Sequence, residues 1–464
     1  MGKSIVTNFI YAFGAQVVSL LTTLVVTLLV PKFIGVEEFG YWQLFLTYVS
    51  YVSMTRLGLS DGLYLRLGGK KYEELDHALL SHERQIYILY QIIVALVFVG
   101  VVCGLPISQD RRFVLLSCAI CIVVVNANGY LIYILQAVNL TSIYSRSVVL
   151  QNLTWFIAAG AICSGLMRSY KIIVVMYICG HLLASIYLIY NAREIVKHKY
   201  VRINRVIDDV RENIRCGFKL MVATYAGALI VASVRIIVDV SWGVEKFSVF
   251  SFSLALSNVF LTFISQVSII VFPALRRVRE DEQKKVYIML RNALSLILPL
   301  VMAGYLPIVL IVYKFLPQYI DSLTFLPVFL PICTFDGKMQ MLCSSFFKSL
   351  RKEDDLLRIN VLTLIFSICI ALVGSCLVKN IYFVAIGILV TVALRSVVSE
   401  IILAKAIGCH IYEDLIMEIA MVAFFVISAS ILTPIIMFGI YTIVYIGYLV
   451  INKRKVVELI KMRR

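Results

Sequence analysis

The sequence is poor in charge: only 15% of its 464 residues are Asp, Glu, Lys or Arg, while 61% are hydrophobic. A water-soluble domain of this length cannot bury so large an apolar fraction, which excludes that class. Proline and tryptophan are scarce, with nine and three residues, so the apolar runs are long and seldom interrupted. The short strands of alternating polarity that build a membrane β-barrel are also missing.

Motifs for catalysis or metal binding are absent from the sequence. There is no H-E-x-x-H, no glycine loop that would hold phosphate and no nucleophile elbow, and the five histidines do not cluster. The eleven cysteines form no disulfide or zinc framework. Cys118 and Cys121 match C-x-x-C, but they lie inside an apolar run. We therefore expect their thiols to pack against lipid or other helices. The sequence therefore predicts no enzyme, no metal and no cofactor.

Apolar runs of about 18 residues or more recur along almost the whole chain, and this is the length that a helix needs to cross hydrocarbon. We predict an all-α polytopic membrane protein with about 14 transmembrane helices. The first run has no small-residue cleavage site, so we expect it to remain as a helix. The predicted spans are 8–30, 41–59, 86–107, 113–137, 148–166, 171–190, 217–240, 248–272, 292–315, 324–347, 358–378, 381–404, 415–432 and 434–452.

The net charge of +16 is distributed unevenly between the two sides of the predicted membrane. If the N-terminus is cytoplasmic, 31 of the 43 Lys and Arg residues fall in cytoplasmic segments and 8 in outer segments. This asymmetry follows the positive-inside rule and predicts that both termini are cytoplasmic. The basic charge thus indicates topology and attraction to anionic lipid, and it argues against nucleic-acid binding.

One short polar segment occurs twice: GVEEFGYW at residues 35–42 returns as GVEKFSVF at residues 243–250. Six predicted spans separate the copies, so both emerge on the outer face. We interpret this as a parallel repeat of two six-helix bundles, the arrangement in which transporters place the substrate path between the halves. The predicted organisation is an N-terminal bundle (1–190), a basic cytoplasmic linker (191–216), a second bundle (217–412) and two additional helices with a basic tail (413–464).

The stretch VPKFIGVEEFGYWQL at 30–44, followed by TRLGLSDGLYLRLGGKK at 55–71, resembles the opening of the O-antigen and polysaccharide flippases of the Wzx type. These belong to the multidrug/oligosaccharidyl-lipid/polysaccharide exporter superfamily. The resemblance implies a MATE-like fold in the bacterial inner membrane. It also implies translocation of an undecaprenyl-pyrophosphate-linked oligosaccharide, an O-antigen or capsule repeat unit, from the cytoplasmic to the periplasmic leaflet. A polysaccharide polymerase and a chain-length regulator would be the associated partners.

Charged residues inside the predicted spans are candidate site residues, because an ionised side chain at membrane depth is costly and usually faces a partner or a polar cavity. The predicted cavity cations, which would hold a diphosphate, are Arg395, Lys338, Arg235 and Arg56. The predicted ion- or proton-coupling residues are Asp239, Asp336 and Glu400. Two alternatives stay open: Arg235 and Asp239 could form a structural i,i+4 pair. Arg56 and Glu400 could reach the cytoplasmic interface from their helix ends.

Uncharged polar side chains within the spans are candidates for lining a path for the sugar: Asn126, Asn128, Asn258 and Gln266. Hydrogen bonding between helices is the alternative for all four. Four prolines concentrate bending positions in the predicted spans 292–315 and 324–347.

Three other functions compete with the flippase. A cation-coupled multidrug antiporter on the same fold would be expected to bury carboxylates in the N-terminal bundle, and the sequence places none at mid-membrane in its first six spans. A membrane glycosyltransferase or polymerase would need a large outer loop, whereas the outer loops here are short. A scaffold without transport would not be expected to keep charges at membrane depth.

Overall fold

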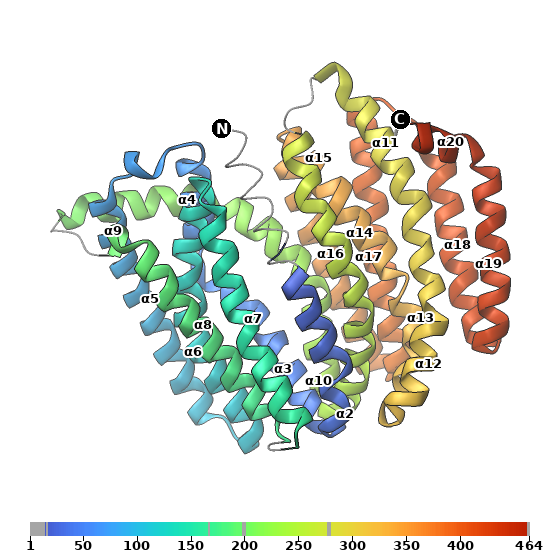
Figure 1. Ribbon diagram of the computed structural model, residues 1–464, viewed down its shortest axis with the longest axis horizontal. Coiled ribbons are helices and arrows are strands. Elements are labelled where there is room, and N and C mark those ends of the chain that lie inside the picture. Colours follow the sequence, from blue (N-terminus) through green and yellow to red (C-terminus); the bar gives the residue numbers. More distant parts are fainter. Residues whose placement is uncertain (1–13, 15–16, 166–167, 197–200, 276–279, 462–464) are drawn as a thin grey trace. The chain divides into compact units, whose positions relative to one another are not determined.

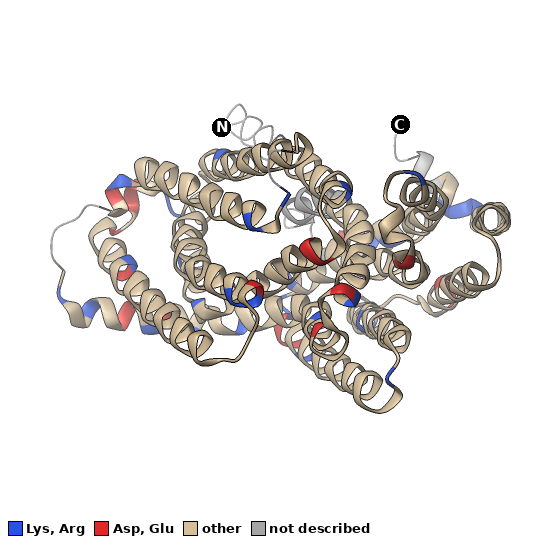
Figure 2. Cartoon of the chain, turned by 90° about the horizontal axis from the view of Figure 1, so that it is seen from below, with Lys and Arg blue, Asp and Glu red and all other residues tan. Residues whose placement is uncertain are grey.

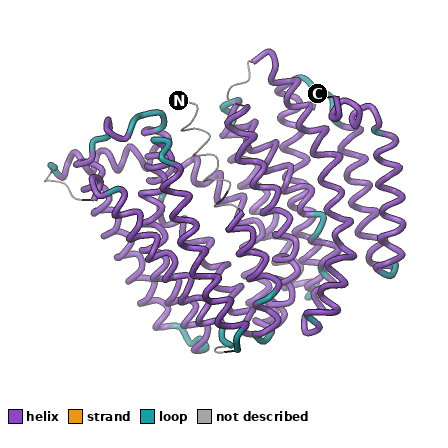
Figure 3. Tube along the Cα trace, viewed as in Figure 1, coloured by secondary structure: helices purple, strands orange, loops and turns teal. Residues whose placement is uncertain are grey.

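The computed structural model describes residues 14, 17–165, 168–196, 201–275 and 280–461, with backbone alone at 263, 265–275, 280–281 and 458–461. Within these residues the chain consists of helices and connecting loops, without strands (Figure 3). Charged residues are sparse along the helices (Figure 2). The predicted all-α membrane architecture is therefore confirmed. The contacts divide the chain into two compact units, unit 1 (Met1–Ala232) and unit 2 (Ser233–Arg464).

Unit 1 is built around one central helix, α6, which packs against five other α-helices of the unit, α3, α4, α5, α7 and α8 (Figure 1). An aromatic cluster joins α3 to its neighbours, since Trp42 contacts Phe45, Trp155 and Tyr177. The elements of unit 1 are α2 (Val30–Phe33), α3 (Val36–Val52), η1 (Ser53–Arg56), α4 (Leu59–Leu67), η2 (Tyr72–Glu74), α5 (His77–Gly104), α6 (Gln109–Ala137), α7 (Thr141–Cys163), α8 (Tyr170–Asn191), α9 (Arg193–Val196) and the first part of α10 (Ile203–Leu275).

Local sequence explains where these helices begin and break. Asp76 caps α5 by accepting a hydrogen bond from the Leu79 N–H at 3.0 Å, and Ser108 caps α6 in the same way. The predicted span 41–59 is interrupted at Leu57 and Gly58, whose φ angles of 53° and 83° lie in the left-handed region. The Leu-Gly-Leu stretch is thus a helix break between α3 and α4.

Unit 2 centres on α17, which contacts α13, α14 and α16. Its elements after α10 are α11 (Glu280–Ile297), η3 (Leu298–Gly304), α12 (Tyr305–Phe315), η4 (Pro317–Thr324), α13 (Leu326–Phe329), α14 (Ile332–Lys338), a π-helical segment η5 (Met339–Cys343), α15 (Ser344–Ser349), α16 (Glu353–Leu372), a second π-helical segment η6 (Val373–Val378), α17 (Ile381–Ile407), α18 (Tyr412–Ile431), α19 (Pro434–Ile451) and α20 (Lys453–Lys461). The many short pieces between α11 and α15 coincide with the proline-rich region.

The two copies of the repeated polar segment differ in backbone conformation. Gly35 precedes α3 with φ −66°, which any residue can adopt, whereas Gly243 bends α10 with φ 80°. The backbone conformation therefore requires glycine at position 243 and not at position 35. Glu38, in the first copy, caps a different helix: its carboxylate accepts a hydrogen bond from the Tyr170 N–H at the start of α8, at 2.7 Å.

Nine helices of the described residues are long and apolar enough to cross a membrane, or ten if a bent pair around α13 is one span. The difference from the predicted 14 has identifiable sources. The continuous α10 contains two predicted spans, 217–240 and 248–272, on either side of Gly243. The predicted span 8–30 lies partly outside the described residues, and α3 is 17 residues long.

Candidate functional site

Lys338 lies at the end of α14 and its side chain is completely buried in unit 2. Its ammonium group contacts two carboxylates: Glu400 of α17, with Nζ and Oε1 2.9 Å apart, and Glu418 of α18. Both glutamates are 1% exposed. A bare ammonium would not be stable at such a position, and these two carboxylates supply its compensating charge.

Arg291 of α11 completes this arrangement from a third direction. Its Nε lies 3.0 Å from Oε2 of Glu400 and its Nη1 lies 2.7 Å from Oδ2 of Asp414. Lys455 of α20 contacts the other oxygen of Asp414 at 2.5 Å. We call these six residues the ion network: Arg291, Lys338, Glu400, Asp414, Glu418 and Lys455.

The ion network contains three positive and three negative side chains, so its formal charge is zero. Such a neutral cluster holds helices together and offers no uncompensated cation to an anionic ligand. The expectation that Lys338 lines a cavity as a cation is corrected here, because two carboxylates enclose it. Glu400, expected as a coupling carboxylate, is likewise an ion-pair partner of Lys338 and Arg291.

One edge of the ion network reaches a pocket of about 350 Å³ within unit 2. Arg291 and Asp414 belong to both the pocket and the network, and Lys284 and His410 contribute further polar groups to the lining. The network is therefore buried at Lys338 and accessible at Asp414, whose side chain is 20% exposed.

Arg395 of α17 forms a separate and partly exposed pair in unit 2. Its Nε donates to Oδ1 of Asn360 at 2.8 Å, and its Nη1 lies 3.4 Å from Oδ1 of Asp336. The side chains keep exposed fractions of 11% for Arg395 and 23% for Asp336. Two predicted site residues are thus brought together, and the guanidinium keeps an exposed edge that can donate to a further acceptor.

In unit 1, Arg56 is held by a network of uncharged polar groups. Its Nε donates to Oδ1 of Asn126 at 2.8 Å, and it lies over the ring of Tyr133 at 5.7 Å. Asn126 in turn donates to Gln91 of α5 and to Thr55. The arginine also borders a mainly apolar cavity of about 180 Å³. The sequence left two roles open for Asn126, lining a path for the sugar or hydrogen bonding between helices. These contacts give it the second role.

The remaining predicted residues occupy scattered positions. Asn128 is buried and bonds the α8 backbone at His181 and the hydroxyl of Ser185, which is again an interhelical contact. Arg235 donates to Ser251 at 3.2 Å and lies over the ring of Phe247, while Asp239 is buried. Asn258 is exposed, and the side chain of Gln266 lies outside the described residues.

Sequence reasoning missed four buried charged residues: Asp61, Glu83, Arg291 and Glu418. Asp61 lies two residues after the predicted span 41–59, and Glu83 and Arg291 lie just before the predicted spans 86–107 and 292–315, yet all three are buried inside helices. Glu418 lies within the predicted span 415–432 and should have been counted with the other intramembrane charges. A charge within one helical turn of a predicted span boundary was the available indication in each case.

No protein-family model matches the sequence, and a comparison with curated proteins finds no match. Solved structures do match. The lipid II flippase MurJ, in an inward closed conformation, is 16% identical with a TM-score of 0.67, covering 97% of this chain and 100% of MurJ. An inward-facing multidrug resistance MATE transporter of the MOP superfamily is 12% identical with a TM-score of 0.60, covering 85% of this chain and 94% of its own. A MOP superfamily transporter from Pyrococcus furiosus is 14% identical with a TM-score of 0.53.

These likenesses show that the chain has the fold of MATE-type and MurJ-type membrane transporters. The extent of the match differs between them. The MATE structures cover 85 to 88% of this chain, whereas the MurJ match leaves only 3% uncovered. That remainder is too small to omit residues 413–464, so the match with MurJ extends into the additional C-terminal helices α18 and α19.

Proposed function

We propose that the protein is a flippase that moves an undecaprenyl-pyrophosphate-linked oligosaccharide, an O-antigen or capsule repeat unit, from the cytoplasmic to the periplasmic leaflet. The observation that carries this proposal is the near-complete match with the fold of a lipid II flippase, including the C-terminal helices. Transport would proceed by alternating access between the two units, as in other parallel-repeat transporters. Both termini would be cytoplasmic in a bacterial inner membrane.

The exposed edge of Arg395 supports an anionic headgroup as cargo. A guanidinium offers five N–H donors, and Asn360 and Asp336 engage only part of them. The donors left over suit a diphosphate, whose oxygens accept paired hydrogen bonds from a planar guanidinium. Arg235 is a second partly exposed arginine in unit 2. Arg395 therefore replaces Lys338 as the principal cation in this proposal.

An apolar groove in unit 2 supports a lipid-linked rather than a water-soluble cargo. It has a volume of about 490 Å³ and lies between α14, α17 and α18. Arg395 and Asp336 do not line it, and Arg395 lies on the opposite side of α17 from Val390, Leu394 and Val397. A polyprenyl tail can occupy such a groove, while Arg395 would meet the headgroup on the other side of the helix.

A cation-coupled multidrug antiporter remains the second candidate function. Unit 1 buries two carboxylates that lie outside the predicted spans, Glu83 and Asp61, and buried carboxylates are what ion coupling would need. The extent of the structural match favours the flippase, because the MATE structures leave 12 to 15% of this chain uncovered and the MurJ match leaves 3%.

Complementation of a flippase-null bacterial strain tests the proposal. The wild-type chain should restore surface polysaccharide, and Arg395→Ala should abolish or strongly reduce it at equal expression. Arg358→Ala is the matched control, since Arg358 is an exposed arginine on the neighbouring helix α16. Drug resistance without polysaccharide export by the wild-type chain would favour the antiporter instead.

A further inference from the structure

Glu83 is a fully buried carboxylic acid in the second turn of α5 that the proposed transport path does not use. Its Oε1 accepts a hydrogen bond from Nδ2 of Asn213 in α10 at 2.8 Å, and its Oε2 lies 3.1 Å from the hydroxyl of Tyr130 in α6. Within the described part of the chain, no Lys or Arg lies at ion-pair distance from it. Its direct partners are therefore an amide and a phenol.

The hydrogen-bonding groups around Glu83 can all be satisfied when its carboxyl group is protonated and neutral. The Tyr130 hydroxyl has a second acceptor, the backbone carbonyl of Leu80, at 2.9 Å. When Glu83 is protonated, its O–H can donate to the Tyr130 oxygen while the Tyr130 proton points to Leu80. When Glu83 is ionised, Leu80 and the carboxylate compete for that one proton. An ionised carboxylate also loses its water of solvation here without gaining a cation.

The same asparagine fixes the start of α10 against α4. Asn213 is fully buried; its Oδ1 accepts from Arg66 and its Nδ2 also donates to Asp209. A Cβ placed on Gly62 of α4 would lie 1.9 Å from the Asn213 carbonyl oxygen. One turn later, a Cβ on Gly217 would lie 2.0 Å from the Gly58 oxygen. The backbones of α4 and α10 are therefore in direct contact. Glu83 accepts a hydrogen bond from Asn213, which belongs to this contact.

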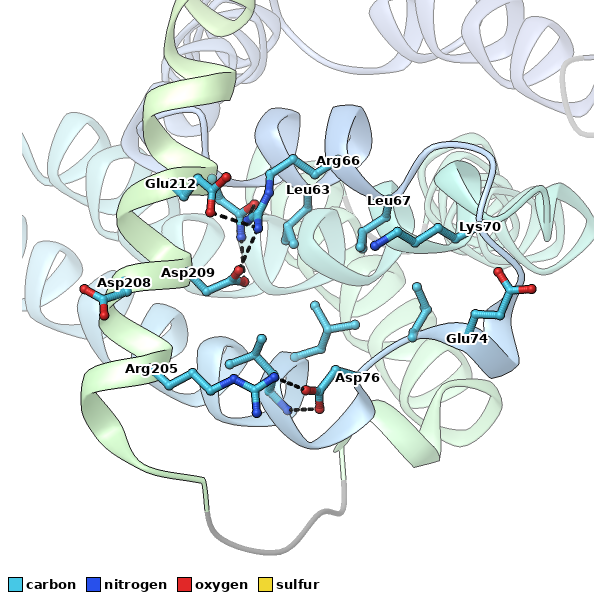
Figure 4. A pocket seen from close by; sticks show the side chains of 14 residues that line it. Leu63, Arg66, Leu67, Lys70, Glu74, Asp76, Arg205, Asp208, Asp209 and Glu212 are labelled. Carbon is cyan, nitrogen blue, oxygen red and sulfur yellow. Dashed lines mark hydrogen bonds and ion pairs between the residues drawn. The ribbon is translucent and has the colours of Figure 1, made fainter.

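A charged pocket of about 450 Å³ lies beside this contact in unit 1 (Figure 4). Arg66 from α4 points to Asp209 and Glu212 of α10, and Arg205 of α10 pairs with Asp76 ahead of α5 (Figure 4). Asp209 lines the pocket with a side chain that is 16% exposed, and it accepts a hydrogen bond from Asn213, so one residue separates the pocket water from the partner of Glu83. The titratable and charged groups around Glu83 are Arg66, Asp209 and Glu212 at the pocket, Tyr130 on α6, and Arg84 and Tyr87 on α5.

We propose that Glu83 is a proton-binding site, and that its protonation holds the start of α10 against α4 and α5. The proton enters from the pocket and binds Oε2, and its release leaves a buried negative charge that weakens this contact. By linkage, opening of the contact solvates the carboxyl group and favours release of the proton. Naming the proton as a coupling ion for transport rests on the proposed function; the proton site itself does not.

Infrared difference spectroscopy against pH, on the full chain in lipid nanodiscs and without any substrate, tests proton binding. The wild type should show a protonated carboxyl C=O band that disappears reversibly as the pH is raised. Glu83→Gln should lack that band, because the amide imitates the neutral acid. Glu73→Gln, which removes an exposed carboxylate of the nearby loop, should retain it. An unchanged band in Glu83→Gln, or no titrating band in the wild type, would overturn the proposal.

Hydrogen–deuterium exchange of residues 203–216 at different pH values tests the effect on α10. After correction for intrinsic exchange, the wild type and Glu73→Gln should exchange faster at the higher pH, and Glu83→Gln should stay slow throughout. Should Glu83→Gln fail to fold, Asn213→Ala serves instead. It deletes a donor to the ionised form, so the acid band should persist to a pH about one unit higher, a tenfold change in proton affinity. An unshifted band there would contradict the proposal, whatever the outcome of complementation.

Discussion

The hydroxyl of Tyr448 in α19 donates a hydrogen bond to the backbone carbonyl of Ser295 in α11, at 3.2 Å. Ser295 lies four residues before Pro299, which has no N–H, so this carbonyl lacks its normal helical donor. Tyr445 and Tyr441 of α19 likewise donate to the carbonyls of Leu296 and Pro299, at 2.7 and 2.8 Å. The last long helix thus completes the hydrogen bonding of a broken one.

Replacing these tyrosines should weaken the bent helix. Each Tyr→Phe change at 441, 445 or 448 removes a donor to a carbonyl inside the protein, and we expect a loss of about 1 kcal/mol in unfolding free energy for each. Tyr412→Phe, at an exposed position, is the control and should have little effect. Denaturant unfolding in detergent measures the difference. Equal stability of Tyr441→Phe and Tyr412→Phe would contradict the role assigned to α19.

Removing Lys338 should be much more costly, because it leaves Glu400 and Glu418 facing each other without their shared cation. We expect Lys338→Met to lose about 3–5 kcal/mol of unfolding free energy. Glu400 keeps its ion pair with Arg291, so combining Lys338→Met with Glu418→Gln removes the carboxylate that has lost its closest cation and should recover part of the loss. A double variant no more stable than Lys338→Met would show that the ion network does not couple these two residues.

The close contact between α4 and α10 leaves no space for a side chain at its glycines, so a larger residue there should destabilise the protein. A methyl group at Gly217 would lie 2.0 Å from the Gly58 oxygen, so the helices must separate. We expect Gly217→Ala to cost about 1–3 kcal/mol as an overpacking substitution. Gly439→Ala in α19, with nothing within 4 Å of the new methyl, should be neutral or slightly stabilising. Thermal unfolding with matched detergent compares them, and similar behaviour of the two variants would argue against direct backbone contact.

Much of the fold follows from the sequence, because long apolar runs leave a chain few alternatives to membrane helices. The break at Leu57 and Gly58 and the bend at Gly243 occur at glycine positions that the sequence had marked. The equivalence of Gly35 and Gly243 could not be judged from sequence, since identical residues adopt different backbone angles in the two copies.

The sequence identified some of the charged residues of the site, but not which of them form ion pairs with each other. Lys338, Glu400, Arg395 and Asp336 were all selected as charges at membrane depth. Which carboxylate meets which cation depends on the rotation of each helix about its axis, and no local pattern encodes that rotation. Glu418, from a helix that the repeat does not include, decides that Lys338 is neutralised.

The central claim is that this chain moves a diphosphate-linked lipid across a bilayer, with Arg395 in contact with the headgroup. Purified protein in liposomes, loaded with a fluorescent undecaprenyl-pyrophosphate-linked sugar, allows the transbilayer movement to be followed by quenching of the outer leaflet. The wild type and Arg358→Ala should move the labelled lipid well above protein-free liposomes, and Arg395→Ala should fall to that background. No movement by folded wild-type protein, or equal rates for Arg395→Ala and the wild type, would contradict the account.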